Sequence, residues 1–168
     1  METLTLYELN NLVRGVLEQT LPDTYWIKAE LSELNERHGH CFLELVQKDE
    51  GSDSLIAKAR GQIWASRWAM LRTYFSHTTG QPLQAGMQVL LEVSVTFHEL
   101  YGYSLNVVDI DPTYTMGDIA RRRQEILQKL REEGVDMMNK ELPLPMLLKR
   151  IAVISSPTAA GYGDFCNQ

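Results

Sequence analysis

The chain has 168 residues, of which 44% are hydrophobic, and a formal net charge of −6. This composition excludes an intrinsically disordered chain, and no apolar run reaches the ~18 residues that a membrane span needs. The first residues lack the basic and apolar regions of a secretory signal peptide. The two cysteines, Cys41 and Cys166, have neither disulfide-framework nor metal-ligand spacing. We therefore expect a soluble, cytoplasmic protein with no membrane partner, no metal site and no cofactor.

Charge is distributed unevenly along the chain. Residues 1–114 hold 8 Lys/Arg and 15 Asp/Glu, whereas residues 115–168 hold 8 and 7. Because nucleic-acid contacts need clustered positive charge, the overall charge does not favour such a partner. A nucleic-acid site in residues 1–114 therefore has to be a local basic patch or to rely on stacking.

The first predicted element is an amphipathic helix. Thr5 and Glu8 have the spacing of a capping box, and Pro22 follows the end of the pattern. Apolar residues recur at helical spacing in between: Leu6, Leu9, Leu12, Val13, Val16 and Leu17. We expect this helix to close one end of a hydrophobic core.

Three strands are predicted next, because the hydrophobic period changes to two. They cover residues 25–32, 41–46 and 55–64. One face of the third strand carries Leu55, Ala57, Ala59, Gly61 and Ile63, and the other carries Ile56, Lys58, Arg60, Gln62 and Trp64. The small residues of the first set suit the crowded inside of a narrow barrel.

A short helix over residues 66–75 and two more strands, 89–97 and 103–110, follow. Three strands, a helix and a two-stranded hairpin are the element order of an OB-fold, a five-stranded Greek-key barrel. A sandwich needs more strands, and a parallel sheet needs a helix after each strand. The sequence thus predicts a mainly β domain with flanking helices (α+β) at residues 1–114.

The last third of the chain is predicted to be a connection and the start of a second domain. A helix over 116–133 and a proline-containing segment make residues 115–149 a linker. Residues 151–154 are a β-branched apolar run, typical of a strand covered on both faces. One strand cannot bury both faces by itself. We therefore expect residues 150–168 to begin an α/β domain whose remaining sheet lies outside this sequence.

A nucleic-acid surface is predicted on the second and third strands and the adjoining loops. Single strands are held by aromatic side chains that stack on bases and by Lys or Arg beside phosphates, and these strands are the usual platform in this fold. The alternative is that Phe42 and Tyr103 belong to the core, as aromatic residues often do, and that the other candidates lie on an ordinary solvated face. The candidate residues are Lys28, His38, His40, Phe42, Lys58, Arg60, Trp64, Tyr101 and Tyr103.

Two further segments are weaker candidates for anion contact. The three arginines at 121–123 are close in sequence to Asp118 and Glu125, so a solvated helix face is favoured over a phosphate site. The polar turn at 155–164 follows a predicted strand, where α/β sheets place ligands. It contains no nucleotide-binding glycine motif, so spacing alone favours an ordinary connection.

Several segments together resemble the exodeoxyribonuclease VII large-subunit family. In family order they are residues 6–13, 39–45, 85–89, 101–105, 133–136 with 140–145, and 150–158. The resemblance implies an N-terminal OB domain that binds single-stranded DNA. It also implies a catalytic domain that hydrolyses single-stranded DNA from either end to acidic oligonucleotides, generally without a metal. A small subunit is expected to bind through a region beyond residue 168.

By the same resemblance, Asp164 matches a catalytic aspartate of the family. The chain departs from the family pattern there, because Ala159-Ala-Gly161 replaces Gly-Ala-Ala and Gly163 precedes the aspartate. The other catalytic residues of the family lie downstream, so we expect residues 1–168 alone not to cleave DNA.

Two alternative functions of the OB domain stay open. One is an OB module that docks on its own catalytic domain or a partner subunit, and the other is the tRNA-binding barrel of a synthetase, which fits residues after 115 poorly.

Overall fold

The computed structural model describes residues 3–49, 51–52, 54–138, 140, 142–143, 153–156 and 160–167. The strands are β1 (Thr24–Arg37), β2 (His40–Lys48), β3 (Leu55–Ile63), β4 (Gln88–His98) and β5 (Gly102–Asp111). The helices are α1 (Leu6–Thr20), α2 (Ala65–Thr79), α3 (Pro112–Glu132), α4 (Val135–Met138) and α5 (Ala160–Asn167). The chain divides into two compact units, residues 1–126 and 127–168.

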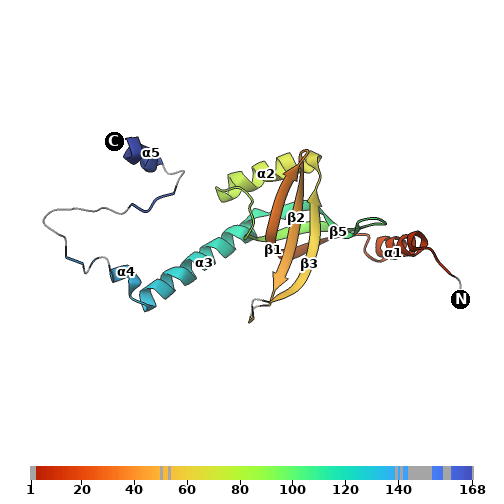
Figure 1. Ribbon diagram of the computed structural model, residues 1–168, viewed down its shortest axis with the longest axis horizontal. Helices are drawn as coiled ribbons and strands as arrows, with labels where there is room; N and C mark the ends of the chain where they lie inside the picture. The colour runs from red at the N-terminus through yellow and green to blue at the C-terminus, as the bar shows by residue number, and fades with distance from the viewer. Residues whose placement is uncertain are drawn as a thin grey trace. The chain divides into compact units, whose positions relative to one another are not determined.

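The five strands form a closed barrel in the order β1-β2-β3-β5-β4 (Figure 1). β1 pairs with both β2 and β4, and every pair is antiparallel except β3 with β5, which is parallel. Closure removes the unpaired strand edges that would otherwise invite association. The predicted five-stranded OB-fold with flanking helices is confirmed.

β1 ends at Arg37, five residues beyond the end that its hydrophobic alternation predicts. Its register shifts between Leu31 and Glu33, which is a β-bulge. A bulge bends the strand and raises its twist. Here the bend lets the first part of β1 pair with β4 and the last part pair with β2. The bulge also breaks the alternation, so the predicted strand stops at the same place.

The β1–β2 hairpin turns through two residues, His38 and Gly39. Their φ angles are 51° and 80°, so both lie in the left-handed region. Two positive φ angles define the tight turn whose twist matches that of the flanking strands. The turn fixes the register, which places Arg37 opposite His40 and Asn35 opposite Phe42.

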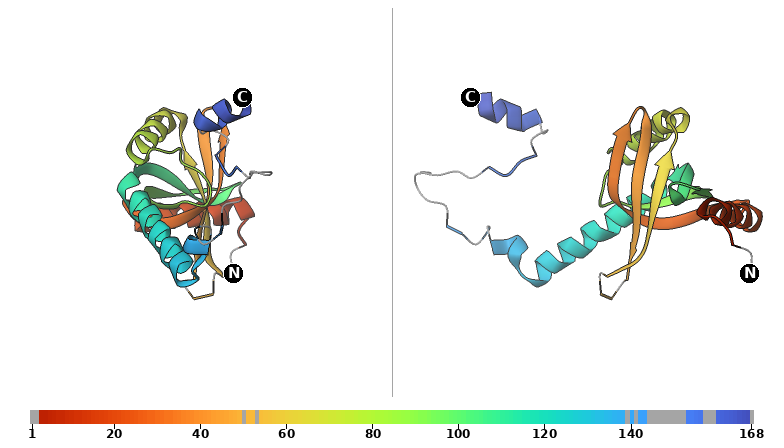
Figure 2. Two further views of the ribbon diagram at one scale, coloured as in Figure 1. Left: turned by 90° about the vertical axis from the view of Figure 1, so that its left-hand side faces the viewer. Right: turned by 45° about the vertical axis from the view of Figure 1, so that its right-hand side comes forward.

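The barrel interior is filled by the inward positions of all five strands, as the alternation predicts. α2 closes one end (Figure 2), where its Trp68, Leu71 and Phe75 are buried in the same core. Gly61 illustrates how narrow the interior is. A Cβ at this position would lie 3.4 Å from Cβ of Leu43 and 3.4 Å from Cδ1 of Leu45. A Cβ at position 61 would therefore just touch Leu43 and Leu45, so a small residue suits this inner position.

α1 begins with the predicted capping box. The Thr5 hydroxyl accepts a hydrogen bond from the Glu8 amide, and Oε2 of Glu8 accepts one from the Thr5 amide at 2.7 Å. The bond from the Thr5 amide, followed by one that the Thr5 hydroxyl donates to the same oxygen at 2.8 Å, lowers the pKa of Glu8. Two of the unpaired amides at the helix start are satisfied in this way.

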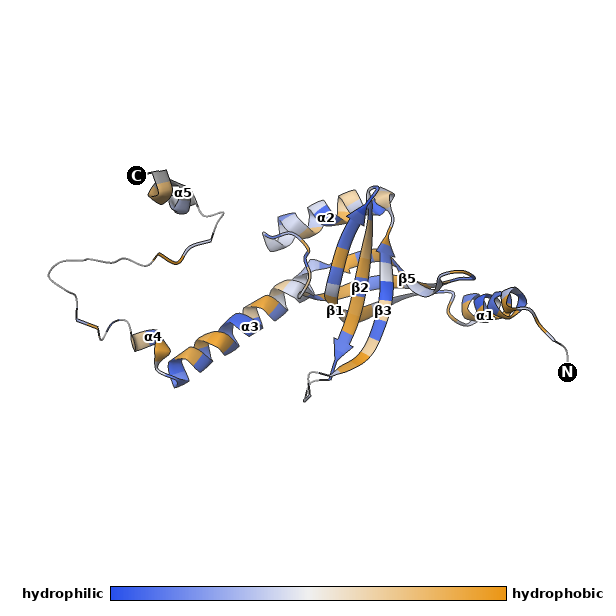
Figure 3. Cartoon of the chain, in the orientation of Figure 1, coloured by the Kyte–Doolittle hydropathy of each residue, from blue (hydrophilic) through white to orange (hydrophobic). Residues whose placement is uncertain are grey.

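The expectation that α1 closes the core is wrong. No α1 residue is buried, and most of its apolar positions (orange in Figure 3) are exposed, with Leu6 at 74%. The polar side of the helix faces the barrel instead. Nδ2 of Asn10 donates to the Glu99 carbonyl at 2.9 Å, and Nη1 of Arg14 lies 2.7 Å from Oε1 of Glu99. Because α2 already fills one end of the barrel, α1 is left with these polar contacts at the β4–β5 hairpin.

α3 starts at Pro112, four residues before the predicted position. Proline is favourable at the first helical position, and Asp111 accepts a hydrogen bond from the Thr113 amide at 2.8 Å. Thr115 is buried and donates to the Gln88 carbonyl at 2.8 Å, which fixes the start of α3 to the barrel. The interpretation of the three arginines as a solvated helix face is confirmed for Arg121. Its Nη2 lies 2.7 Å from Oδ1 of Asp118, and its Nη1 lies 2.6 Å from Oε1 of Glu125.

In the second unit, residues 153–156 form neither helix nor strand. The strand predicted for 151–154 is therefore absent from its described half, and residues 151–152 lie outside the described part. A strand exists only with a hydrogen-bonding neighbour, and none is formed here. The boundaries at 115–149 stay a prediction. Within the described ranges, no helix is long and apolar enough to cross a membrane.

Candidate nucleic-acid interface

The outer side of β1, β2 and β3 forms one continuous face, because directly paired residues of neighbouring strands point the same way. One row across it consists of Asn35, Phe42 and Gln62, and the next consists of Glu33, Glu44 and Arg60. Arg37 and His40 pair at the hairpin end, beside Trp64. We call this surface the β1–β3 face. It is defined by Glu33, Asn35, Arg37, His40, Phe42, Glu44, Arg60, Gln62 and Trp64.

Three predicted aromatic residues meet on this face. The His40 ring lies 5.2 Å from the Trp64 ring, centroid to centroid, at 85°, and 6.5 Å from the Phe42 ring. Phe42 is 43% exposed and Trp64 is 47% exposed. The alternative that Phe42 is a core residue is thus wrong. Two open aromatic rings are available for stacking with a ligand.

His40 is held in place by α2. Its Nδ1 accepts a hydrogen bond from the Ala65 amide, the first residue of α2, at 3.1 Å. The preceding residue, Trp64, offers no side-chain cap, so the imidazole satisfies one of the unpaired amides at the helix start. An imidazole that accepts through Nδ1 carries its hydrogen on Nε2. His38 is exposed in the adjacent turn.

The two predicted cations of β3 differ in their partners. Nζ of Lys58 lies 2.8 Å from Oε2 of Glu44, whose other oxygen accepts from the Ser32 hydroxyl at 2.8 Å. The Lys58 hydrogen bond and then the Ser32 hydrogen bond are the main causes that lower the pKa of Glu44. Arg60 is opposite Glu44 in register but forms no ion pair with any described residue. Arg60 is therefore the more available cation.

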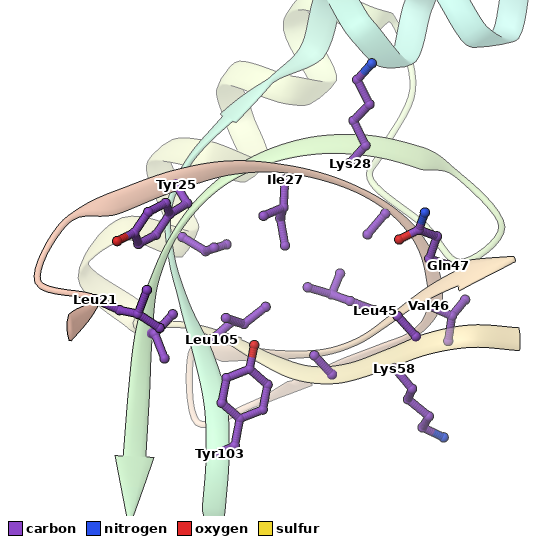
Figure 4. Close-up of a pocket in the computed structure, with 15 residues that line it drawn as sticks. Leu21, Tyr25, Ile27, Lys28, Leu45, Val46, Gln47, Lys58, Tyr103 and Leu105 are labelled. Atoms are coloured by element: carbon purple, nitrogen blue, oxygen red, sulfur yellow. The ribbon is translucent and has the colours of Figure 1, made fainter. Parts of the chain in front are cut away.

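Tyr103 and Lys58 also lie at the open end of the barrel, opposite α2. A cavity of about 380 Å³ lies there, lined mainly by apolar side chains such as Ile27, Leu45 and Leu105. Figure 4 shows these three pointing into it, with Tyr25 and Tyr103 at its rim and Lys58 extending away. The volume is within the range of small-molecule sites.

The remaining predicted residues lie elsewhere. Lys28 is on the part of β1 that pairs with β4, and its Nζ lies 5.5 Å from the ring centroid of Tyr114. Tyr101 is in the β4–β5 hairpin, with its ring 4.8 Å from that of His98. The structure therefore brings together His38, His40, Phe42, Arg60 and Trp64, and places Lys58 beside them. Lys28, Tyr101 and Tyr103 do not lie on the β1–β3 face.

Sequence reasoning missed two of the amides near the aromatic cluster. Asn35 lies beyond the predicted end of β1, on the far side of the bulge. Asn106 on β5 pairs with Gln62 on β3 through the parallel contact that closes the barrel. No local pattern predicts which residues meet at such a closure.

The predicted catalytic residue, Asp164, falls within α5, but its side chain lies outside the described part of the structure. A metal centre is also not formed by the described residues, since no three His, Cys, Asp or Glu side chains gather among them. Chemistry at Asp164 therefore stays a prediction.

Comparison with known proteins supports the OB-fold and the family resemblance described above. Residues 4–111 match the family model described as OB-fold nucleic acid binding domain. The chain is 40% identical over 166 residues to the exodeoxyribonuclease 7 large subunit of Deinococcus radiodurans, a match that covers 96% of this chain and 40% of the relative. It is 33% identical over 167 residues to the large subunit of Thioalkalivibrio sulfidiphilus, covering 97% and 33%. The resemblance seen in the sequence is thereby confirmed.

The chain spans 40% and 33% of the lengths of these two relatives. Among solved structures, it is similar to a small single-stranded DNA binding protein from Mycoplasma pneumoniae. That match has 10% identity and a TM-score of 0.38, and it covers 53% of this chain and 91% of the other.

Proposed function

The chain belongs to the family of OB-fold nucleic acid binding domains, and from that premise we propose that its β1–β3 face binds single-stranded DNA. The observation that carries the proposal is the exposed pair Phe42 and Trp64, with the unpaired Arg60 in the neighbouring row. Stacking on aromatic rings and charge beside the phosphates are the two interactions that hold single strands in this fold.

A single strand fits this face better than a duplex does. The rings of Phe42 and Trp64 offer stacking surfaces, and only unpaired bases expose their own faces to them. Duplex binding relies mainly on many cation–phosphate contacts. Residues 1–114 carry an excess of acidic residues, 15 against 8. Stacking therefore has to supply much of the affinity.

The proposal extends to the longer proteins that the chain resembles. We assign this chain the strand-holding part of an exodeoxyribonuclease VII large subunit, a cytoplasmic enzyme that hydrolyses single-stranded DNA from either end. Asp164 is proposed as one catalytic residue, and a small subunit is proposed to bind beyond residue 168. The names of the relatives support this assignment. Purified 1–168 should release no acid-soluble nucleotides, and clear release would contradict the proposal.

Lys28, Tyr101 and Tyr103 stay proposed contacts of a strand that continues past the β1–β3 face. Tyr101 is 74% exposed and Tyr103 is 47% exposed. Both are therefore open to stacking at the β4–β5 end of the barrel. Their substitution should weaken the binding of long oligonucleotides more than that of short ones, because a short oligonucleotide occupies only the β1–β3 face.

The test of the proposed function is fluorescence anisotropy with labelled oligo-dT and with a duplex of equal length, over a series of salt concentrations. We expect tighter binding of oligo-dT and an affinity that falls as salt rises. Absence of oligo-dT binding at low salt would contradict the proposal for this chain.

The exposed apolar side of α1 favours a second candidate function, contact with another protein. Leu6, Leu9 and Val16 point to solvent in the first unit, and contiguous exposed apolar residues commonly mark interaction surfaces. The salt series separates the two candidates, since a barrel used only for protein contact would bind neither oligonucleotide.

A further inference from the structure

Phe42 lies in a row of amide side chains that follows the outside of the barrel. Asn35 on β1 is its direct partner on one side, and Gln62 on β3 is its partner on the other. Gln62 in turn pairs with Asn106 on β5, which pairs with Ser94 on β4. One exposed aromatic ring is therefore flanked on both sides by groups that each carry a donor and an acceptor.

Among the described residues, only one of these three amides, that of Asn106, bonds within the fold. Among the described residues, the side chains of Asn35 and Gln62 make no hydrogen bond. Nδ2 of Asn106 reaches Oγ of Ser94 only at 3.4 Å, and its Oδ1 is buried without any partner. Buried polar atoms without partners are rare because they cost free energy. Gln62, the neighbour of Asn106 across the β3–β5 contact, therefore keeps its own amide available to a ligand.

The spacing suits one nucleobase. Neighbouring strands lie ~4.8 Å apart, so a base stacked on the Phe42 ring brings its edge to the amide of the next strand. An amide presents its donor and its acceptor side by side, as the edges of bases do. The adjacent row carries Arg60, which is placed for a phosphate of the same strand. Phosphate contacts position the strand and base contacts specify it.

We propose that Phe42 and its flanking amides form a base-reading subsite, in which one base stacks on Phe42 and Gln62 binds its hydrogen-bonding edge. Asn106 supports the Gln62 side and Asn35 lies on the opposite side of the ring. This inference rests on the proposed single-strand binding and goes beyond it. The affinity of the chain then depends on base identity at one position.

The test compares the affinities of short oligo-dT, oligo-dC and oligo-dA for the wild type, Gln62→Leu and the control Gln19→Leu. Gln19 is exposed on α1, away from the row. We expect the wild type to prefer one homopolymer by about fivefold or more, the effect of one good amide–base pair. Gln62→Leu should bring the three affinities within about twofold of one another with its salt dependence unchanged, because no phosphate contact is lost. Gln19→Leu should match the wild type.

A second variant keeps the inference testable if Gln62→Leu does not fold. Gln62→Glu replaces a donor and an acceptor by acceptors alone, so the preference should move away from oligo-dT and towards oligo-dC and oligo-dA, whose exocyclic amino groups donate. Equal affinities in the wild type, or an unchanged preference in both variants, would overturn the base-reading subsite while leaving single-strand binding intact. Absence of binding to all three oligonucleotides would overturn single-strand binding itself, and the subsite with it.

Discussion

Lys58 and Glu44 form an ion pair across β2 and β3, with Nζ of the lysine 2.8 Å from Oε2 of the glutamate. Ser32 holds the other carboxylate oxygen at 2.8 Å. Glu44 belongs to the β1–β3 face and Lys58 lies beside it, so the carboxylate neutralises Lys58 and also attracts the nearby Arg60. Glu44 therefore limits the charge that this face offers to a phosphate.

Glu44→Gln should strengthen oligo-dT binding, because it removes a negative charge from the face and frees the Lys58 ammonium. If Lys58 then contacts one more phosphate, the slope of log affinity against log salt should steepen by about 0.7. Glu18→Gln is the matched control, since it removes an equal charge from exposed α1. An unchanged affinity and slope in Glu44→Gln would show that Lys58 does not reach the strand.

The same pair predicts how acid affects binding. The pKa of Glu44 is lowered in the folded protein, first by Lys58 and then by Ser32. Its contribution to folding is therefore complete above the ordinary carboxyl pKa and is lost only as pH falls through the lowered value. Binding that strengthens at this low pH in the wild type, but not in Glu44→Gln, would confirm the link in a titration of anisotropy against pH. Equal responses would contradict it.

Arg60→Gln should weaken oligo-dT binding more than Lys58→Gln does. Arg60 has no ion-pair partner among the described residues, whereas Lys58 is already bound to Glu44. The salt slope of Arg60→Gln should be shallower by about 0.7, the value for one lost phosphate contact. Arg123→Gln removes an equal charge from exposed α3 and should leave the slope unchanged. The reverse ranking of Arg60 and Lys58 would refute this assignment.

Stacking is tested with Phe42→Ala and with tryptophan fluorescence. Removal of one stacking ring should cost ~1–3 kcal/mol of binding free energy.

Oligo-dT should also quench the emission of exposed Trp64, and the quenching should be lost in Trp64→Phe. Trp26→Phe provides the control, since Trp26 is exposed on the part of β1 that pairs with β4. Quenching that survives in Trp64→Phe but not in Trp26→Phe would place the bound DNA beside the β1–β4 pair and would contradict binding at the β1–β3 face.

Cys41 should resist alkylation in the folded protein. Its side chain is fully buried, and burial followed by the nearby Glu36 charge raises the pKa of its thiol to about 12. Cys166 is exposed. Mass spectrometry after iodoacetamide treatment at about pH 8, near an ordinary thiol pKa, should show one adduct on the native protein and two after denaturation. Rapid labelling of Cys41 in the native state would contradict its place in the barrel core.

Two leucines on different helices should differ sharply in their effect on stability. Leu71 of α2 is buried in the barrel core, so Leu71→Ala should lower the free energy of unfolding by ~2–5 kcal/mol. Leu9 of α1 is exposed, so Leu9→Ala should change it by less than about 0.5 kcal/mol. Urea denaturation measures both. A similar loss in the two variants would mean that α1 does help to close the core.

The barrel was predictable because its local signals agree with one another. The alternation in β3 predicts Gly61 and Ile63 inside and Arg60 outside, and the structure has Gly61 and Ile63 buried and Arg60 exposed. A hydrophobic period of two is visible within a single strand, so it can be recognised without knowing which strands are its neighbours. The place of α1 was not predictable in the same way, because its apolar spacing is identical whether the helix faces a core or solvent.

The candidate site was predictable only in part, since it depends on register. Phe42 and Arg60 were recognisable from residue type and strand position. Asn35 and Asn106 join them through the β1 bulge and the parallel β3–β5 contact, and both are non-local. Tyr101 lies in the β4–β5 hairpin, as the sequence predicts, with its ring beside that of His98 and away from the β1–β3 face.

The most direct test of the β1–β3 face is an NMR titration of the isotope-labelled 168-residue chain with short oligo-dT. The account predicts that the largest shift changes occur at Asn35, Phe42, Arg60, Gln62 and Trp64. Signals from α1 and from the exposed face of α2 should stay in place. Shift changes confined to α1 or α2, with those five residues unaffected, would contradict the account.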